Sequence, residues 1–352
     1  MNITFIGDIF PSNELFSLGF GIKSKFEEKY GNNWRANLLS ITKGSDIVVG
    51  NLESPLLDSS LTSKKDFYGN PNFAYFLKGC GIGILNIANN HILEHGKMGY
   101  EETLKSLADA KIKALGDDNK VLFLKRDGCN IAFAGFCGVD LNAVDHDGCF
   151  SVLNKQNVFS ALNDMISNKA DLKIFCFHWG NEYIHKPSME QRNFAINLID
   201  AGADIIIGHH PHVIQPYERY KNGHIFYSLG NLCFDNPFQS RQFSKGMGVT
   251  ITYDTIKKSI EKVCPFGIRL SQKYLVYKMP SSQFDSYFGK IQKNYEIMKK
   301  NKKYSAVYAK ELNRRHVIER VLMKLSLLQL YFNLDSKERR LLLKNLIHYY
   351  LK

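Results

Sequence analysis

Polar residues stand at the ends of five apolar segments, and this pattern constrains the fold more than any other feature of the chain. The apolar segments have the length and the isoleucine, valine and phenylalanine content of buried strands. Helical patterns separate them, so the sequence predicts an α/β fold whose ligands lie beyond the carboxyl ends of the strands. The polar residues are Asp8 after ITFIG, Glu53 after DIVVGNL, Asn90 and His91 after GILNIAN, His178 after LKIFCF, and His210 and His212 after ADIIIGH.

The apolar periodicity alternates between strands and helices along residues 1–255. It predicts strands at residues 3–7, 46–50, 83–88, 129–137, 172–178, 203–208 and 225–230. It predicts helices at residues 24–42, 100–116, 154–169 and 188–201, the second of them ending at Gly116. Residues 257–279 could form a terminal strand pair. The expected order is therefore β-α-β throughout, with one domain over residues 1–280.

The positive charge of the chain is concentrated in its C-terminal fifth. Residues 281–352 contain 16 basic and 6 acidic side chains, whereas the preceding 280 residues contain 30 and 28. Apolar residues recur there at helical spacing, so we predict a basic helical region. It could pack on the first domain, or contact an anionic membrane or a membrane-bound complex. Nucleic-acid binding is not expected, because no recognised motif accompanies the charge.

The cysteines and the apolar stretches bear on the cellular compartment. Seven cysteines show no CxxC spacing, and several lie in apolar runs, which favours reduced, packed thiols. The opening residues MNITFIGD do not have the charged and apolar regions of a secretory signal. The longest apolar stretch, residues 321–334, is interrupted by Lys324 and is too short to span a bilayer. These observations predict a protein that is cytoplasmic or peripheral to the inner membrane.

Metal binding is one interpretation of the polar strand ends. His210 and His212 can hold adjacent metals if the backbone turns sharply between them, and Pro211 favours such a turn. Glu53 could bridge two cations, and Asn90 offers a neutral oxygen ligand. The alternative interpretation is structural: buried and hydrogen-bonded histidines, carboxylates that cap loop amides, and an asparagine that only stabilises a turn.

Six motifs, taken in order, resemble the CapA proteins. This family is associated with bacterial capsule and poly-γ-glutamate synthesis and is similar in fold to calcineurin-like metallophosphoesterases. The motifs are GDIF at 7–10, NLESP at 51–55, ANNHILEHG at 88–96, HWGNEY at 178–183, GHHPHVIQP at 208–216 and YSLGNLCFD at 227–235. The resemblance implies a four-layer α/β/β/α sandwich of the metallophosphoesterase type, here with a helical extension at residues 281–352.

The resemblance also implies a role for each motif residue. One divalent ion would be held by Asp8, Glu53 and His212, and a second by Glu53, Asn90, His178 and His210. His91 matches the catalytic histidine of the family, which donates a proton to the leaving group or stabilises developing charge. The residues expected to line the pocket or to support the ligands are Trp179, Glu182, Asn231 and Asp235, although Trp179 could equally be a core residue.

The first motif departs from that of the phosphoesterases, which carry Asp-x-His. Here Asp8 is followed by Ile9 and Phe10, so one imidazole ligand is lost, as it generally is in CapA proteins. Mainly oxygen ligands then remain for that ion, so Mn²⁺ is expected first, with Mg²⁺, Fe²⁺ or Zn²⁺ as alternatives. Either one or two ions could bind, because Glu53 also replaces a shorter aspartate.

Two functions are compatible with these residues. The first is a metal-dependent hydrolase that cleaves a phosphoester, or an amide or ester of an anionic polymer, during capsule or cell-surface polymer synthesis. The second is a non-catalytic assembly or binding factor that holds an anionic polymer and docks on a membrane-bound synthesis complex. The lost histidine and the basic region favour the second function.

Overall fold

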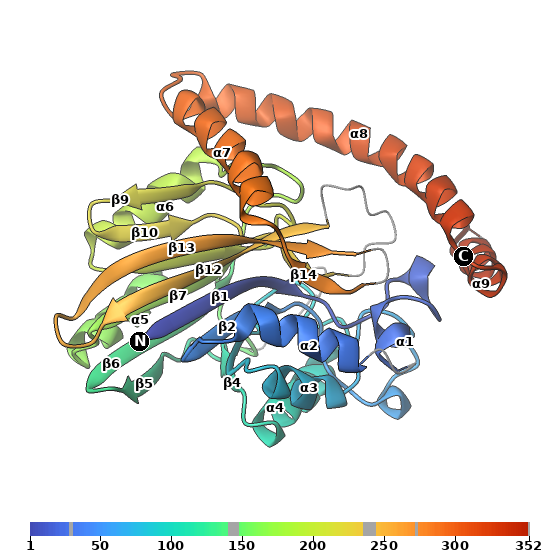
Figure 1. The fold of residues 1–352 in the computed structure, drawn as a ribbon, viewed down its shortest axis with the longest axis horizontal. Coiled ribbons are helices and arrows are strands. Elements are labelled where there is room, and N and C mark those ends of the chain that lie inside the picture. Colours follow the sequence, from blue (N-terminus) through green and yellow to red (C-terminus); the bar gives the residue numbers. More distant parts are fainter. Residues whose placement is uncertain (28–30, 140–147, 235–243, 272–273, 351–352) are drawn as a thin grey trace.

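The computed structural model describes residues 1–27, 31–139, 148–234, 244–271 and 274–350. Two β-sheets lie face to face, and helices cover their outer faces (Figure 1). The fold is therefore the predicted α/β/β/α sandwich of the metallophosphoesterase type.

The first sheet has the strand order β14-β13-β12-β1-β2-β3-β4, with β11 paired to β1. Its strands are β1 (Asn2–Ile9), β2 (Ile47–Leu52), β3 (Ile84–Asn86), β4 (Lys113–Leu115), β11 (Asn231–Cys233), β12 (Lys245–Asp254), β13 (Ser259–Leu270) and β14 (Val276–Lys278). Strands β1 to β4 are parallel, and β12 runs antiparallel to β1. Between β1 and β4 the chain forms η1 (Leu15–Ser17), α1 (Ile22–Glu27), α2 (Gly31–Thr42), η2 (Ser59–Leu61), α3 (Asn72–Gly79) and α4 (Gly96–Asp109).

The second sheet has the strand order β5-β6-β7-β8-β10-β9. Its strands are β5 (Leu122–Arg126), β6 (Cys129–Cys137), β7 (Leu172–His178), β8 (Ile205–His209), β9 (Tyr217–Tyr220) and β10 (Gly223–Phe226). Helices α5 (Lys155–Ser167) and α6 (Met189–Asp200) connect its parallel strands. Helix α6 begins with a capping box, in which the side chains of Ser188 and Gln191 each accept a hydrogen bond from the other's backbone N–H.

Alternate residues of the central strands pack on opposite sides of their sheet. Ile3 and Phe5 of β1 point toward the second sheet, whereas Ile6 and Ile9 pack with the helices on the outer face. Because both faces of the sheets are buried, the central strands are mostly apolar, and the sequence pattern predicts them directly. The buried Thr4 within β1 bonds to the hydroxyls of Ser45 and Thr250, and Asp8 stands near the end of the strand.

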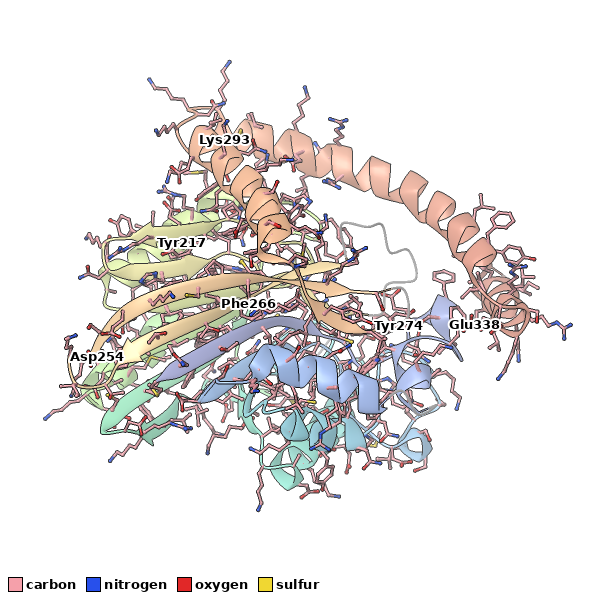
Figure 2. All side chains as sticks on the ribbon, in the orientation of Figure 1. Tyr217, Asp254, Phe266, Tyr274, Lys293 and Glu338 are labelled. Carbon is pink, nitrogen blue, oxygen red and sulfur yellow. The ribbon has the colours of Figure 1, made fainter. Side chains whose placement is uncertain are left out.

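The C-terminal region consists of α7 (Ser281–Met298), α8 (Tyr304–Asn333) and α9 (Ser336–Tyr350). Lys293 on α7 and Glu338 on α9 lie at opposite ends of this region (Figure 2). None of the described helices is long and apolar enough to cross a membrane.

A buried carboxylate joins α7 to the second sheet. Glu218 on β9 accepts hydrogen bonds from the Arg192 guanidinium and from the hydroxyls of Tyr227 and Tyr295. Tyr295 belongs to α7, so this helix donates one of the hydrogen bonds that stabilise the buried Glu218 carboxylate. Helix α7 is therefore part of the folded core.

The two ends of the helical pair α8–α9 contact segments that follow strands of different sheets. At its start, Tyr304 donates to the carbonyl oxygen of Pro187 at 2.7 Å, and Tyr308 accepts from Asn181 at 2.8 Å. Both partners lie in the loop between β7 and α6. At the other end, Glu338 on α9 forms an ion pair of 2.7 Å with Lys25 on α1.

Three sequence predictions need correction. The helix expected at 100–116 ends at Asp109, because Lys111 adopts a positive φ of 57° and Lys113–Leu115 then pair as β4 beside β3. The helix expected at 24–42 is found as α1 and α2, and the residues between them lie outside the described part. The strand expected at 225–230 is found as β10, which ends at Phe226, and β11, which begins at Asn231.

The order is also not β-α-β throughout, because β5–β6, β9–β10 and β12–β13–β14 are antiparallel neighbours. The Asp127-Gly128 turn between β5 and β6 has φ values of 48° and 76°, which is the local signal that the periodicity overlooked. The strand pair expected within 257–279 is confirmed as β13 and β14.

His224 on β10 makes acid stability testable. Its Nδ1 lies 2.7 Å from the Tyr217 hydroxyl, and burial lowers the pKa of His224 to about 4. The unfolded chain has a histidine pKa of about 6.5, so it binds the proton first and the wild type loses stability as the pH falls from about 6.5 to 4. We expect His224→Gln to lose about 2 kcal/mol less over this window, measured by urea unfolding at several pH values. An identical pH dependence of the two proteins would contradict this assignment.

Candidate metal centre

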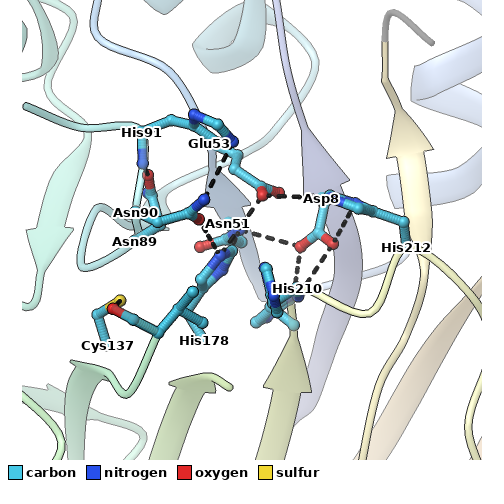
Figure 3. A network of polar contacts seen from close by, with 12 residues as sticks. Asp8, Asn51, Glu53, Asn89, Asn90, His91, Cys137, His178, His210 and His212 are labelled. Atoms are coloured by element: carbon cyan, nitrogen blue, oxygen red, sulfur yellow. Dashed lines mark hydrogen bonds and ion pairs between the residues drawn. The ribbon is translucent and has the colours of Figure 1, made fainter. Parts of the chain in front are cut away.

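The strand ends bring the polar residues of the two sheets to one edge (Figure 3). Asp8 on β1 lies beside Asn51 on β2, and His178 on β7 lies beside His209 on β8. The loop after β2 adds Glu53, which is fully buried, as are Asp8 and His178. The edge therefore gathers charged and polar side chains in an interior where each one needs a partner.

Two groups of possible metal ligands share Glu53. One group is Glu53, His210 and His212, and the other is Asp8, Glu53 and His178; within each, the ligand atoms all lie within 4.8 Å of one another. One oxygen of Glu53 lies 3.4 Å from His178 Nε2 and 3.6 Å from His212 Nε2. Glu53 is therefore the residue that a cation in either group would share.

Several buried polar atoms of the site lack a hydrogen-bond partner among the described residues. They include both carboxylate oxygens of Glu53 and Nδ1 of His210. Burial raises the pKa of Glu53 well above its usual value, and the neighbouring charges of Asp8 and Glu182 raise it further. A divalent cation would supply the missing partner and keep this carboxylate ionised, so the residues present fit a metal.

The HHPH segment makes the sharp turn that the sequence predicted. His210 and His212 both have positive φ, 94° and 55°, on either side of Pro211. This backbone conformation is rare outside glycine, and here it turns both imidazoles toward Glu53. Burial lowers the pKa of His210 to about 4 and also lowers that of His178. Both rings are thus neutral, which is the form that binds metal.

The expected neighbours lie side by side, and the two ligand groups overlap. His212 Nδ1 lies 3.6 Å from Asp8 Oδ2, and the ring centroids of His178 and His210 lie 4.9 Å apart. The turn at Pro211 also brings the His210 and His212 rings within 5.8 Å of each other, so the two share a group with Glu53. Asn90 does lie beside His178 as expected, with its Oδ1 2.8 Å from His178 Nε2.

A second layer of side chains orients Asp8, and the sequence reasoning missed it. Asn51 donates to Asp8 Oδ1 at 2.9 Å, and Asn86 donates to the Asn51 amide oxygen at 2.9 Å. His209 Nδ1 also lies 2.9 Å from Asp8 Oδ1. Burial alone would raise the pKa of Asp8, but the hydrogen bonds of His209 and His212 lower it well below its usual value. The available signal was a polar Asn86 inside the apolar strand GILNIA.

His91 stands beside the ligand groups without belonging to either. Asn90 Nδ2 lies 3.2 Å from its Nε2, and Glu94 Oε1 lies 3.0 Å from its Nδ1. Burial would raise the pKa of Glu94, but hydrogen bonds from His91 and Lys64 lower it to about 2. The Glu94 carboxylate at Nδ1 and the Asn90 amide at Nε2 therefore fix the orientation of the His91 ring.

Aromatic rings hold His91 in place. Phe67 stacks on the imidazole with the ring centroids 5.0 Å apart, and Phe10 meets it edge-on at 6.0 Å. Phe10 occupies the position where phosphoesterases carry the histidine of their first motif. In this chain that position therefore supports the proposed proton donor and supplies no metal ligand.

The four residues expected around the pocket have different placements. Asn231 lies 3.0 Å from His212 Nδ1 through its Oδ1, which leaves Nε2 free to face Glu53. Glu182 is exposed, and its charge acts on Glu53, His210 and His212. Trp179 is a correction: it is buried in the core and donates to the Tyr227 carbonyl oxygen. Asp235 lies outside the described residues.

The two-sheet sandwich is a metallophosphoesterase-like fold. A solved structure described as a novel phosphatase from Mycoplasma pneumoniae superposes with a TM-score of 0.50 at 17% identity, covering 82% of this chain and 98% of that one. At this identity the likeness concerns the fold alone.

Sequence comparison then gives the family. Residues 2–236 match the family described as bacterial capsule synthesis protein PGA_cap, so the chain belongs to this family. It is 34% identical over 259 residues to the capsule biosynthesis protein CapA of Bacillus anthracis and 31% identical over 248 residues to the PGA biosynthesis protein CapA of Bacillus subtilis. Each alignment covers 67% of this chain, but only 60% and 63% of the respective relative.

Proposed function

We propose that this protein is a metal-dependent hydrolase that acts in the synthesis of a bacterial capsule or another cell-surface polymer. The reaction is cleavage of a phosphoester, or of an amide or ester within an anionic polymer. The observation that carries the proposal is the buried carboxylate of Glu53, which two ligand groups share and which has no hydrogen-bond partner among the described residues. The His91–Glu94 pair lies outside both groups.

The residues of the chain divide into holding and proton-transferring groups. The cations would be held by Asp8, Glu53, His178, His210 and His212. When bound, they would supply an activated water and positive charge for the developing oxyanion. His91 would donate a proton to the leaving group, and the Glu94 carboxylate, 3.0 Å from Nδ1, would hold the ring in orientation. A donor set of carboxylates, imidazoles and an amide oxygen suits Mn²⁺, with Mg²⁺, Fe²⁺ or Zn²⁺ as alternatives.

A non-catalytic role in polymer assembly is the second candidate. Phe10 in the first motif favours it, because the cluster around Asp8 has one imidazole fewer than a phosphoesterase. In that case the same residues would hold a metal that binds an anionic polymer without cleaving it.

The test compares two substrates with and without metal. The purified protein, stripped of metal and then reloaded with Mn²⁺, is incubated with bis(p-nitrophenyl) phosphate and separately with poly-γ-glutamate. We expect Mn²⁺-dependent release of p-nitrophenolate, or of new amino groups from the polymer, and neither product with His178→Ala. A protein that binds Mn²⁺ but releases neither product would support the assembly role.

A further inference from the structure

Helix α9 carries apolar residues on two faces, one packed on the protein and one exposed. Its inner face is settled by contacts: Leu342 is buried, and Asn345 Nδ2 donates to the carbonyl oxygens of Phe16 and Leu18. At 3.6 residues per turn, the opposite face points to solvent. That outward face carries Leu343 and Ile347, flanked by Arg340 and Lys344.

Large apolar side chains are exposed on the outward face of α9 and near the end of α8. Leu343 and Ile347 are 45% and 58% exposed, and near the end of α8 Leu328 and Phe332 are 58% and 70% exposed. The end of α8 lies close to the start of α9, because Arg339 donates to the carbonyl oxygen of Phe332 at 3.1 Å. Exposed apolar side chains therefore gather around the α8–α9 junction, where they mark an interaction surface.

A basic hollow adjoins this apolar surface. It measures about 310 Å³ and is lined by Ser336, Lys337, Arg340, Leu341 and Lys344. Its three cationic side chains are exposed, and the nearby carboxylate of Glu338 is already paired with Lys25. The first turn of α9 adds the positive end of a helix dipole. The hollow therefore suits the phosphate of a lipid headgroup.

We propose that the outward face of α9, together with the end of α8, docks on an anionic phospholipid bilayer. Headgroup phosphates occupy the basic hollow, while Leu343 and Ile347 enter the interface between headgroups and acyl chains. A soluble polyanion would leave the apolar side chains in water. A second copy of the chain would bring two basic faces together. A bilayer with negative headgroups satisfies both halves of the surface.

The test is co-sedimentation of the full chain with vesicles of phosphatidylcholine, with and without phosphatidylglycerol. We expect binding only when phosphatidylglycerol is present. Combining Lys337→Gln, Arg340→Gln and Lys344→Gln should weaken it about tenfold or more. Combining Leu343→Ser and Ile347→Ser should weaken it about tenfold. All these side chains are exposed, so circular dichroism and the Tm should match those of the wild type.

Matched variants elsewhere on the surface serve as controls. Lys65→Gln, Lys97→Gln and Lys105→Gln remove the same charge from exposed positions, and Ile256→Ser removes a side chain that is 91% exposed. Neither control should change binding. The proposal is overturned if the wild type ignores phosphatidylglycerol vesicles, or if it binds inorganic phosphate only. It is also overturned if the apolar variant binds as the wild type does, because the surface would then recognise charge alone.

Discussion

Replacing Glu53 by glutamine is expected to abolish high-affinity binding of divalent cations at both ligand groups. Glu53 is the only residue that the two groups have in common among the described residues, and glutamine removes its negative charge while keeping its shape. Cations at about a hundred times their Kd should stabilise the wild type by about 3 kcal/mol and the variant by nearly nothing. Without metal the variant should be at least as stable, because the buried carboxylate of the wild type has no hydrogen-bond partner.

The measurement is metal content by elemental mass spectrometry after Mn²⁺ loading, together with the Tm in Mn²⁺ and in chelator. Glu182→Gln is the matched control, because it removes an exposed carboxylate that belongs to neither ligand group. It should keep its metal. Retention of a full complement of Mn²⁺ by Glu53→Gln would show that the site is not built around this carboxylate.

Replacing His91 by alanine is expected to lower kcat about 10²- to 10⁴-fold while the bound metal stays. The imidazole lies outside both ligand groups, so its loss removes a proton donor and no cation. Turnover of the phosphodiester or of the polymer, whichever the Mn²⁺ protein cleaves, gives kcat, and elemental analysis gives the metal content. Loss of metal with His91→Ala would instead make this histidine a ligand.

Two further substitutions separate chemistry from packing. Glu94→Gln leaves the imidazole in place but removes its ionised partner, so we expect a smaller loss of kcat than with His91→Ala and a changed pH–rate profile. His95→Ala removes a ring on the same segment that is bonded to Thr62 and to the carbonyl oxygen of Asp66. It should leave the pH–rate profile unchanged. If Glu94→Gln behaves like His95→Ala, the carboxylate is only structural.

The layers of the fold could be predicted because the central strands are buried on both faces. ITFIG, DIVVG and LKIFCF are continuous apolar runs with no competing helical period, so their location and the polar residue that ends each one were visible. Short or edge strands were harder. Three residues separate KAL of β4 from the end of a helix, and the left-handed Lys111 is one of them. The β5–β6 hairpin depends on its Asp-Gly turn, which periodicity does not register.

Strand ends predicted which side chains meet at this edge, but not the backbone conformation that directs two of them. Spacing placed Asp8, Glu53 and His178 at one edge, whereas the directions of His210 and His212 depend on two positive φ angles that the sequence only hinted at through Pro211. The supporting contacts were also missed. Asn51 donates to Asp8, and Asn86 supports Asn51 from the next strand. Such a chain of hydrogen bonds can be predicted only when the strand order is known.

The C-terminal helices tie together loops that follow one strand of each sheet. Tyr304 and Tyr308 on α8 are bonded to the loop after β7, while Glu338 on α9 holds Lys25 in the segment after β1. Helix α8 has 30 residues, so it forms a strut about 45 Å long between these attachments. The two sheets, which carry Asp8 and His178, are therefore connected in two ways: by the core between them and by the C-terminal helices on the outside. Any widening of the edge that carries Asp8 and His178 must bend this strut or detach one of its ends.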